Sequence, residues 1–170
     1  DLDASDILSF LDHALASVPG LDASRVGVQG GSYGGYMTAW LIGHTDRFAA
    51  AIVERGFLDT ESFIGHSDIG WFFVEEYNGA DAAHRVTQSP MSFVSEVRTP
   101  TLVIHSEDDL RCPLGPALRY YTTLKLNKVD AELLVFPGEN HELSRSGTPH
   151  HRKQRFDAIL DWWGRHLPLA

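Results

Sequence analysis

The chain has 170 residues, of which 43% are hydrophobic and 22% are charged, the composition of one soluble globular domain. Its net charge of −9 argues against nucleic acid and anionic membranes as partners. The single cysteine excludes an internal disulfide framework and a cysteine-rich metal cluster, and together with the acidic balance it favours a cytoplasmic location.

Four short segments of apolar, β-prone residues predict buried strands. They cover residues 25–29, 49–53, 101–105 and 131–136. Because these segments are apolar rather than alternating, they predict a parallel sheet with helices on both faces. The expected fold class is therefore α/β.

Helical patterns lie before, between and after these strands. The predicted helices run over residues 4–17, from a glycine-rich turn to about His44, over 113–126, and from Thr148 through Trp163. The segment 57–95 lacks such a pattern, so it is predicted to be irregular, with many aromatic side chains.

The glycine-rich turn reads Gly30-Gly31-Ser32-Tyr33-Gly34, which fits the pattern G-x-S-x-G. It lies between a predicted strand and a predicted helix, where a sharp turn strains the serine backbone and lifts the hydroxyl clear of the sheet. We expect the flanking glycines to be needed because a Cβ there would collide with the neighbouring strand and helix. The turn predicts Ser32 as a nucleophile and the backbone N–H of Tyr33 as an oxyanion donor. The alternative is a phosphate-binding turn, but no lysine follows and G-x-G-x-x-G is absent.

A serine nucleophile needs a base, and His141 is the strongest candidate among the nine histidines. It lies in a loop just beyond the last predicted strand. Functional groups of open parallel sheets gather at the carboxyl ends of the strands. A solvated loop histidine is the alternative interpretation.

The acid that orients this histidine should follow another strand. The segment after the third predicted strand offers Glu107, Asp108 and Asp109, and spacing does not choose among them. The order serine, acid, histidine is that of the α/β hydrolases. An alternative is a metal site built from His105, these carboxylates and His141, although their spacing resembles no zinc pattern.

Three ordered motifs together resemble the C-terminal catalytic region of the prolyl oligopeptidase family of serine peptidases, and the acylaminoacyl-peptidase-like branch most of all. The motifs are Gly30-Gly31-Ser32-Tyr33-Gly34-Gly35-Tyr36, His105-Ser106-Glu107-Asp108-Asp109-Leu110-Arg111-Cys112-Pro113 and Phe136-Pro137-Gly138-Glu139-Asn140-His141. In the family the acid stands four residues after the strand-end histidine and four before the proline, which implies Asp109. The resemblance implies a triad of Ser32, Asp109 and His141 that hydrolyses short or acylated peptides through an acyl-enzyme at Ser32. It implies neither a metal nor an organic cofactor. Cys112 takes a place usually held by Val or Thr, so we expect a small apolar core residue there.

The resemblance also implies that residues 1–170 form about strands 5 to 8 of an α/β-hydrolase sheet. We expect the upstream half of that domain, which supplies a second oxyanion donor, and a β-propeller to belong to the same enzyme outside this chain. Without upstream strands, strand 25–29 would be an unpaired apolar edge. The expected partners are short peptides and the rest of the enzyme, not nucleic acid or membrane, with a homo-oligomer as an open alternative.

In the family, the segment after the second strand contributes to the pocket for the substrate residue at the cleaved bond. Phe63 and Trp71 are the candidates for lining it, with ordinary core packing as the alternative. Glu54 and Arg55 end the second strand, where successive side chains face opposite ways, so one of them should face the site. We expect Arg55 to bind a substrate carboxylate, with a structural ion pair as the alternative.

Two other functions stay open at this point. One is a carboxylesterase that uses the same triad on an ester. The other is a non-catalytic, hydrolase-like binding module.

Overall fold

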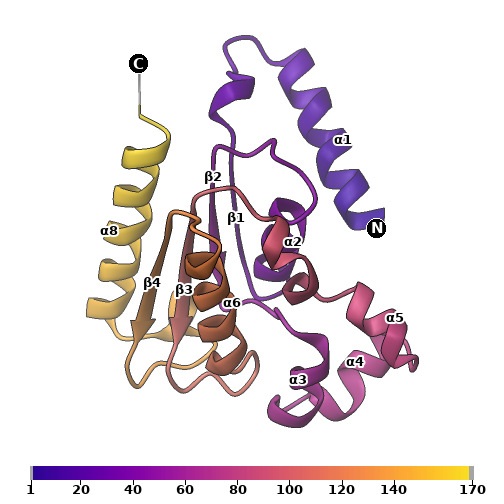
Figure 1. Cartoon of the computed structure of the whole chain (residues 1–170). Coiled ribbons are helices and arrows are strands. Elements are labelled where there is room, and N and C mark those ends of the chain that lie inside the picture. The colour runs from indigo at the N-terminus through magenta and orange to yellow at the C-terminus, as the bar shows by residue number, and fades with distance from the viewer. Residues whose placement is uncertain (1, 169–170) are drawn as a thin grey trace.

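The computed structural model describes residues 2–168 and contains a four-stranded sheet in which all strands are parallel (Figure 1). The strands are β1 (Gly27–Gly31), β2 (Ala50–Glu54), β3 (Thr101–Ser106) and β4 (Ala131–Phe136), side by side in that order. The register pairs Gly31 with Glu54 and Ser106 with Phe136. The carboxyl ends of the strands therefore meet at one edge of the sheet, where the loops after β1, β3 and β4 converge.

Helices cover both faces of this sheet. One face packs against α2 (Tyr33–Ile42) and α6 (Leu114–Leu126), and the other packs against α8 (Pro149–His166) (Figure 1). In β2 and β3, the first core contains Ala51, Val53 and Val103, and the second contains Ile52, Leu102 and Ile104. Because alternate side chains of each strand enter opposite cores, the central residues of β2 and β3 are apolar on both faces. The predicted α/β class is confirmed.

The N-terminal helix α1 (Leu2–Ser17) lies at the margin of the first core. Leu8 and Leu11 pack partly against that core, whereas Ile7 and Phe10 are exposed. The predicted helix is confirmed. The first strand begins two residues later than predicted, because a 3-10 turn, η1 (Ala23–Arg25), occupies its expected start.

The segment between β2 and β3 corrects the prediction of irregular structure. It contains α3 (Thr60–His66), α4 (Gly70–Asn78), α5 (Ala82–Thr87) and the 3-10 segment η2 (Pro90–Glu96). The carboxylate of Asp59 accepts a hydrogen bond from the N–H of Ser62 at 3.3 Å, and Asp81 caps α5 in the same way. Helices this short show too few turns for helical periodicity to stand out in the sequence.

After β4 the chain forms a loop, the short helix α7 (Leu143–Ser146) and then α8. The hydroxyl of Thr148 accepts a hydrogen bond from the N–H of His151, which confirms the predicted start of α8. A buried ion pair fastens α8 to the sheet, since Arg155 donates to both carboxylate oxygens of Glu54, at 2.5 and 2.7 Å. Among residues 2–168, no helix combines the length and the hydrophobicity that crossing a bilayer requires.

Candidate active site

Ser32 lies between β1 and α2, on the turn that the sequence pattern predicted. Its φ is +63° and its ψ is −119°, a conformation that costs energy for any residue with a Cβ. Its N–H donates to the carbonyl of Glu54 at 3.1 Å, and its own carbonyl accepts from the N–H of Tyr36 at 3.0 Å. The strained turn is thus fixed from both sides, by β2 and by the first turn of α2.

The turn requires a glycine at the first position of the G-x-S-x-G pattern but not at the last. A Cβ on Gly30 would overlap the backbone of Gly34, and a Cβ on Gly35 would overlap the carbonyl oxygen of Glu54. A Cβ on Gly34 would meet nothing within 4 Å. The expectation of a collision therefore holds for Gly30 and is wrong for Gly34, because α2 approaches β2 most closely one residue later.

His141 lies in the loop between β4 and α7 and is 9% exposed. Its Nε2 is 2.9 Å from Oγ of Ser32, and its Nδ1 is 2.8 Å from Oδ2 of Asp109. An ionised carboxylate can only accept, so Nδ1 carries the proton in this arrangement and Nε2 is left to accept one. The structure brings together three side chains that lie far apart in the sequence.

Asp109 is the one carboxylate of the three candidates that reaches His141. It is 3% exposed, and its Oδ1 accepts hydrogen bonds from the N–H groups of Arg111 and Cys112 at 3.0 and 2.8 Å. Glu107 and Asp108 are exposed, and Glu107 accepts from a backbone N–H of the next loop instead. The structure thus identifies which of the three acids contacts the histidine, a choice that the sequence spacing did not make.

His105 is buried behind Asp109. Its Nε2 donates to the carbonyl of Cys112 at 2.6 Å and lies 3.7 Å from Oδ2 of Asp109. Burial lowers the pKa of His105 and raises the pKa of the Cys112 thiol to about 12, so both side chains stay neutral at pH 7. Residues 2–168 contain no group of three or more His, Cys, Asp or Glu side chains placed to hold a metal ion.

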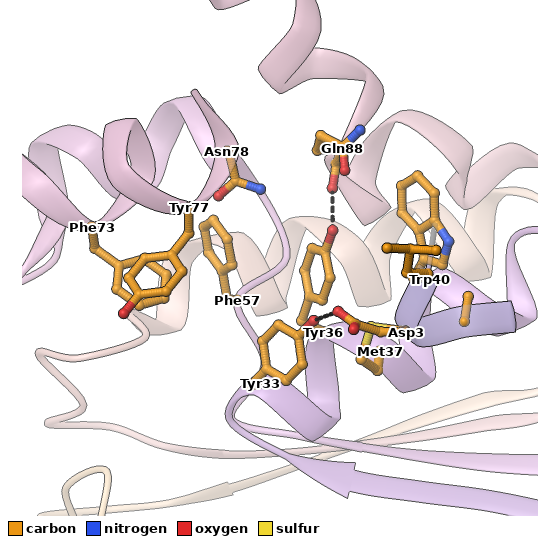
Figure 2. Close-up of a pocket in the computed structure, with 12 residues that line it drawn as sticks. Asp3, Tyr33, Tyr36, Met37, Trp40, Phe57, Phe73, Tyr77, Asn78 and Gln88 are labelled. Carbon is orange, nitrogen blue, oxygen red and sulfur yellow. Dashed lines mark hydrogen bonds between the residues drawn. The ribbon is translucent and has the colours of Figure 1, made fainter. Parts of the chain in front are cut away.

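An aromatic pocket of about 670 Å³ opens beside the serine turn, and Tyr33, the residue after Ser32, forms part of its wall (Figure 2). The lining residues are Leu2, Asp3, Ala4, Tyr33, Tyr36, Met37, Trp40, Phe57, Phe73, Tyr77, Asn78 and Gln88. The hydroxyl of Tyr33 donates to Asp3, and the hydroxyl of Tyr36 donates to the carbonyl of Gln88 at 2.9 Å. Burial and the nearby Asp3 raise the pKa of Tyr36 to about 12, so its hydroxyl remains a donor. Such walls suit an aromatic or aliphatic side chain.

Neither Phe63 nor Trp71, the residues expected from the sequence to bind the substrate side chain, lines this pocket. Phe63 is 3% exposed and packs behind the wall, with its ring centroid 5.8 Å from that of Phe73. Trp71 is 77% exposed and packs on the neighbouring Phe72. Phe73 and Tyr77 line the pocket instead, because residues four apart on α4 share one face of the helix.

The two residues at the end of β2 have separate partners. Glu54 pairs with Arg155 of α8, as described above. Arg55 reaches the histidine loop, where its Nε donates to the carbonyl of His141 at 2.9 Å and its Nη2 donates to Oγ of Ser144 at 3.0 Å. Arg55 therefore lies at the site, hydrogen-bonded to the protein itself.

A serine on a strained strand-to-helix turn of a parallel sheet, in contact with a histidine that is paired with an aspartate, is the arrangement of the α/β hydrolases. Comparison with known proteins identifies the group within that class. The model of the prolyl oligopeptidase family matches residues 1–169, and the chain belongs to this family. The resemblance carried by the three sequence motifs is confirmed.

Individual relatives point to one branch of the family. The chain is 38% identical to the uncharacterized peptidase YuxL of Bacillus subtilis and 35% identical to the acylamino-acid-releasing enzyme of Arabidopsis thaliana. These matches cover 97% and 98% of this chain but 26% and 23% of the relatives, so the chain spans about a quarter of the length of the curated relatives it matches.

Comparison with solved structures also gives similarity to acylaminoacyl peptidases. The acylaminoacyl peptidase of Pyrococcus horikoshii superposes with a TM-score of 0.93 at 34% identity, over 98% of this chain and 28% of that one. An acylaminoacyl peptidase in complex with Z-Gly-Gly-Phe-chloromethyl ketone gives a TM-score of 0.94 at 34% identity, over 99% and 28%. The chain is thus similar to acylaminoacyl peptidases in both sequence and fold.

Proposed function

We propose that this chain carries the active site of a serine peptidase that hydrolyses short or acylated peptides. The observation that supports this most is the continuous path of hydrogen bonds from Oγ of Ser32 through His141 to Asp109, at 2.9 and 2.8 Å. Membership of the prolyl oligopeptidase family makes peptides the expected substrates. A serine hydroxyl gains nucleophilic strength only when a base takes its proton, and this arrangement supplies one.

The proposed reaction is acyl transfer. Oγ of Ser32 attacks the carbonyl carbon of the peptide bond while Nε2 of His141 takes the hydroxyl proton, and Asp109 stabilises the resulting imidazolium. When the tetrahedral intermediate collapses, the C–N bond breaks and His141 returns the proton to the leaving amine. Water then attacks the acyl-enzyme, with the same histidine as base, and releases the acid and the free serine.

The N–H of Tyr33 is the proposed donor to the oxyanion. It belongs to the first residue of α2, and the first N–H groups of a helix have no partner within the helix and lie at the positive end of its dipole. A second donor, from the upstream part of an α/β-hydrolase domain, completes the proposed oxyanion hole. The much greater length of the relatives supports the proposal that such a part, together with a β-propeller, accompanies this chain.

The aromatic pocket is the proposed binding site for the substrate side chain next to the cleaved bond. It adjoins Ser32 through Tyr33, and Phe57, Phe73 and Tyr77 give it flat apolar walls (Figure 2). The related acylaminoacyl peptidase was captured with an inhibitor that contains phenylalanine. An aromatic residue at this position is therefore the proposed preference.

Matched amide and ester substrates test the function. With acetyl-Gly-Gly-Phe p-nitroanilide and the corresponding ester, a peptidase cleaves both, and Ser32→Ala lowers kcat by about 10⁴-fold or more. Ser95→Ala, a change at an exposed serine, is the matched control and should leave both rates unchanged. Cleavage of the ester alone would identify a carboxylesterase, and cleavage of neither would favour a binding module.

A further inference from the structure

Arg55 follows β2 directly and connects it to the loop of His141. Its Nε donates to the carbonyl of His141 at 2.9 Å, and its Nη2 donates to Oγ of Ser144 at 3.0 Å in α7. One guanidinium therefore holds the segment on both sides of residue 142, through the carbonyl of His141 and the side-chain hydroxyl of Ser144. Because the two donors belong to one rigid plane, they fix the orientation of the loop as well as its distance.

The same guanidinium also contacts the serine turn. A Cβ on Gly31 would overlap Nη1 of Arg55, so the side chain packs against the residue that immediately precedes Ser32. Nη1 is buried and has no hydrogen-bond partner among the described residues. Arg55 thus lies between the two segments that carry Ser32 and His141.

The position of Arg55 is energetically unfavourable in itself. Its φ of +36° falls in the region that favours glycine. Burial lowers the pKa of its guanidinium, although the carboxylates of Glu54 and Glu142 act in the opposite direction. Backbone strain of this kind persists only where the surroundings enforce it, which is common at functional sites.

We propose that Arg55 is a positioning residue that holds the His141 loop against the serine turn and so maintains the 2.9 Å contact between Nε2 and Oγ. The inference rests on the proposed function. It differs from the expectation that Arg55 binds a substrate carboxylate, since Nε donates to His141, Nη2 uses one of its two N–H groups on Ser144, and Nη1 is buried. A carboxylate bound to both nitrogens of the Nη1–Nη2 edge would have to reach the buried Nη1.

The test compares Arg55→Met with Arg55→Lys in the full protein. Two readouts apply: kcat and KM on matched peptides with a free or an amidated C-terminus, and the rate at which a fluorophosphonate probe labels Ser32. Arg55→Met should lower kcat and the labelling rate in parallel by about 10- to 100-fold, since small displacements of catalytic groups have effects of this size. KM should change less than about twofold for both peptides, because substrate contacts are unaffected. Arg55→Lys should recover part of the loss, since an ammonium can donate to the His141 carbonyl but cannot span both acceptors.

Two further variants keep the test decisive. Ser144→Ala removes only the acceptor of Nη2, so it should give a smaller loss of kcat, and it serves as the probe if Arg55→Met does not fold. Arg152→Met, at an exposed position of α8, is the matched control and should leave kcat unchanged.

The outcomes separate this inference from the proposed function. An increase of KM for the free-acid peptide alone would assign Arg55 to the substrate, and unchanged kcat and labelling with a lower Tm would make it a purely structural residue. Either result overturns the inference while labelled wild-type protein leaves the proposed function standing. Wild-type protein that the probe does not label overturns both.

Discussion

The carboxylate of Asp109 gives one oxygen to His141 and the other to its own loop. Oδ2 lies 2.8 Å from Nδ1 of His141, whereas Oδ1 accepts from the N–H groups of Arg111 and Cys112. The backbone donors thus determine which oxygen faces the histidine. This division has a direct consequence for an amide at the same position.

Asp109→Asn should fold and lose activity. The two backbone N–H groups require an acceptor, so they hold the amide oxygen of Asn, and the NH₂ group then faces Nδ1 of His141. Nδ1 must accept, so the proton moves to Nε2, which can no longer take the proton of Ser32. We expect kcat to fall about 10⁴-fold, as measured with the peptide anilide, with little change in Tm. Asp108→Asn, at the exposed neighbour, is the control, and a loss below tenfold for Asp109→Asn would contradict the assigned tautomer.

The pocket should discriminate between substrates through α4. Phe73→Ala should lower kcat/KM by about tenfold for a substrate with Phe before the cleaved bond and leave a substrate with Ala there nearly unchanged. Trp71→Ala, two residues away and 77% exposed, should affect neither substrate. If Trp71→Ala caused the larger loss, the pocket of Figure 2 would not be the substrate site.

Glu139 makes the stability of the histidine loop depend on pH. It is 6% exposed and accepts hydrogen bonds from the N–H and hydroxyl of Thr148 and from Nδ1 of His151, which lower its pKa. A carboxyl with a lowered folded pKa stabilises the fold above its ordinary pKa of about 4.3, and this contribution is lost as the pH falls through the folded value. Glu139→Gln should therefore lower the Tm by a few degrees at pH 7, and the difference should shrink at about pH 3.

Thermal unfolding across that pH range checks this prediction. Glu76→Gln, an exposed residue of α4 on another part of the surface, is the control. A Tm difference for Glu139→Gln that stays the same from pH 7 to pH 3 would show that the carboxylate charge is not its source.

Removing only one partner of the ion pair between Glu54 and Arg155 should destabilise the fold strongly. The side chains of Arg155 and Glu54 are 11% and 5% exposed, and Arg155→Met leaves the carboxylate of Glu54 without its cation. We expect the free energy of unfolding to fall by about 3–5 kcal/mol, measured by denaturant unfolding, whereas Glu54→Met with Arg155→Met should lose much less. The exposed change Arg152→Met is again the control. Equal losses of unfolding free energy in the single and the double variant would mean that the packing of the aliphatic parts of these side chains, rather than the unpaired charge, causes the loss.

The sequence predicted the parallel sheet and the placement of Ser32 and His141 at the carboxyl ends of strands because each leaves a local pattern. Continuous apolar runs mark strands buried on both faces, and the turn around Ser32 combines glycines with a strand-to-helix boundary. The choice of Asp109 depended on the family resemblance, because Glu107 and Asp108 also follow β3. Only the hydrogen bonds of the folded loop distinguish Asp109 from these two neighbours.

The lining of the pocket and the hydrogen bonds of Arg55 were not predictable in the same way. Phe73 and Trp71 have similar side chains, and only the rotation of α4 places one inside and the other outside. The caps at Asp59 and Asp81 were visible signals for α3 and α5 that could have revealed this helical segment. The partner of Arg55 is 86 residues away, on a loop whose path depends on the packing of β4 and α8, so no local pattern points to it.

The most direct test of the central claim is to map the site of fluorophosphonate modification in the intact protein by mass spectrometry. We predict one adduct per chain, on Oγ of Ser32, that is absent in Ser32→Ala and forms far more slowly in His141→Asn. An adduct on a different serine, or an unmodified Ser32 in folded protein, would contradict the proposal that this serine and histidine act together.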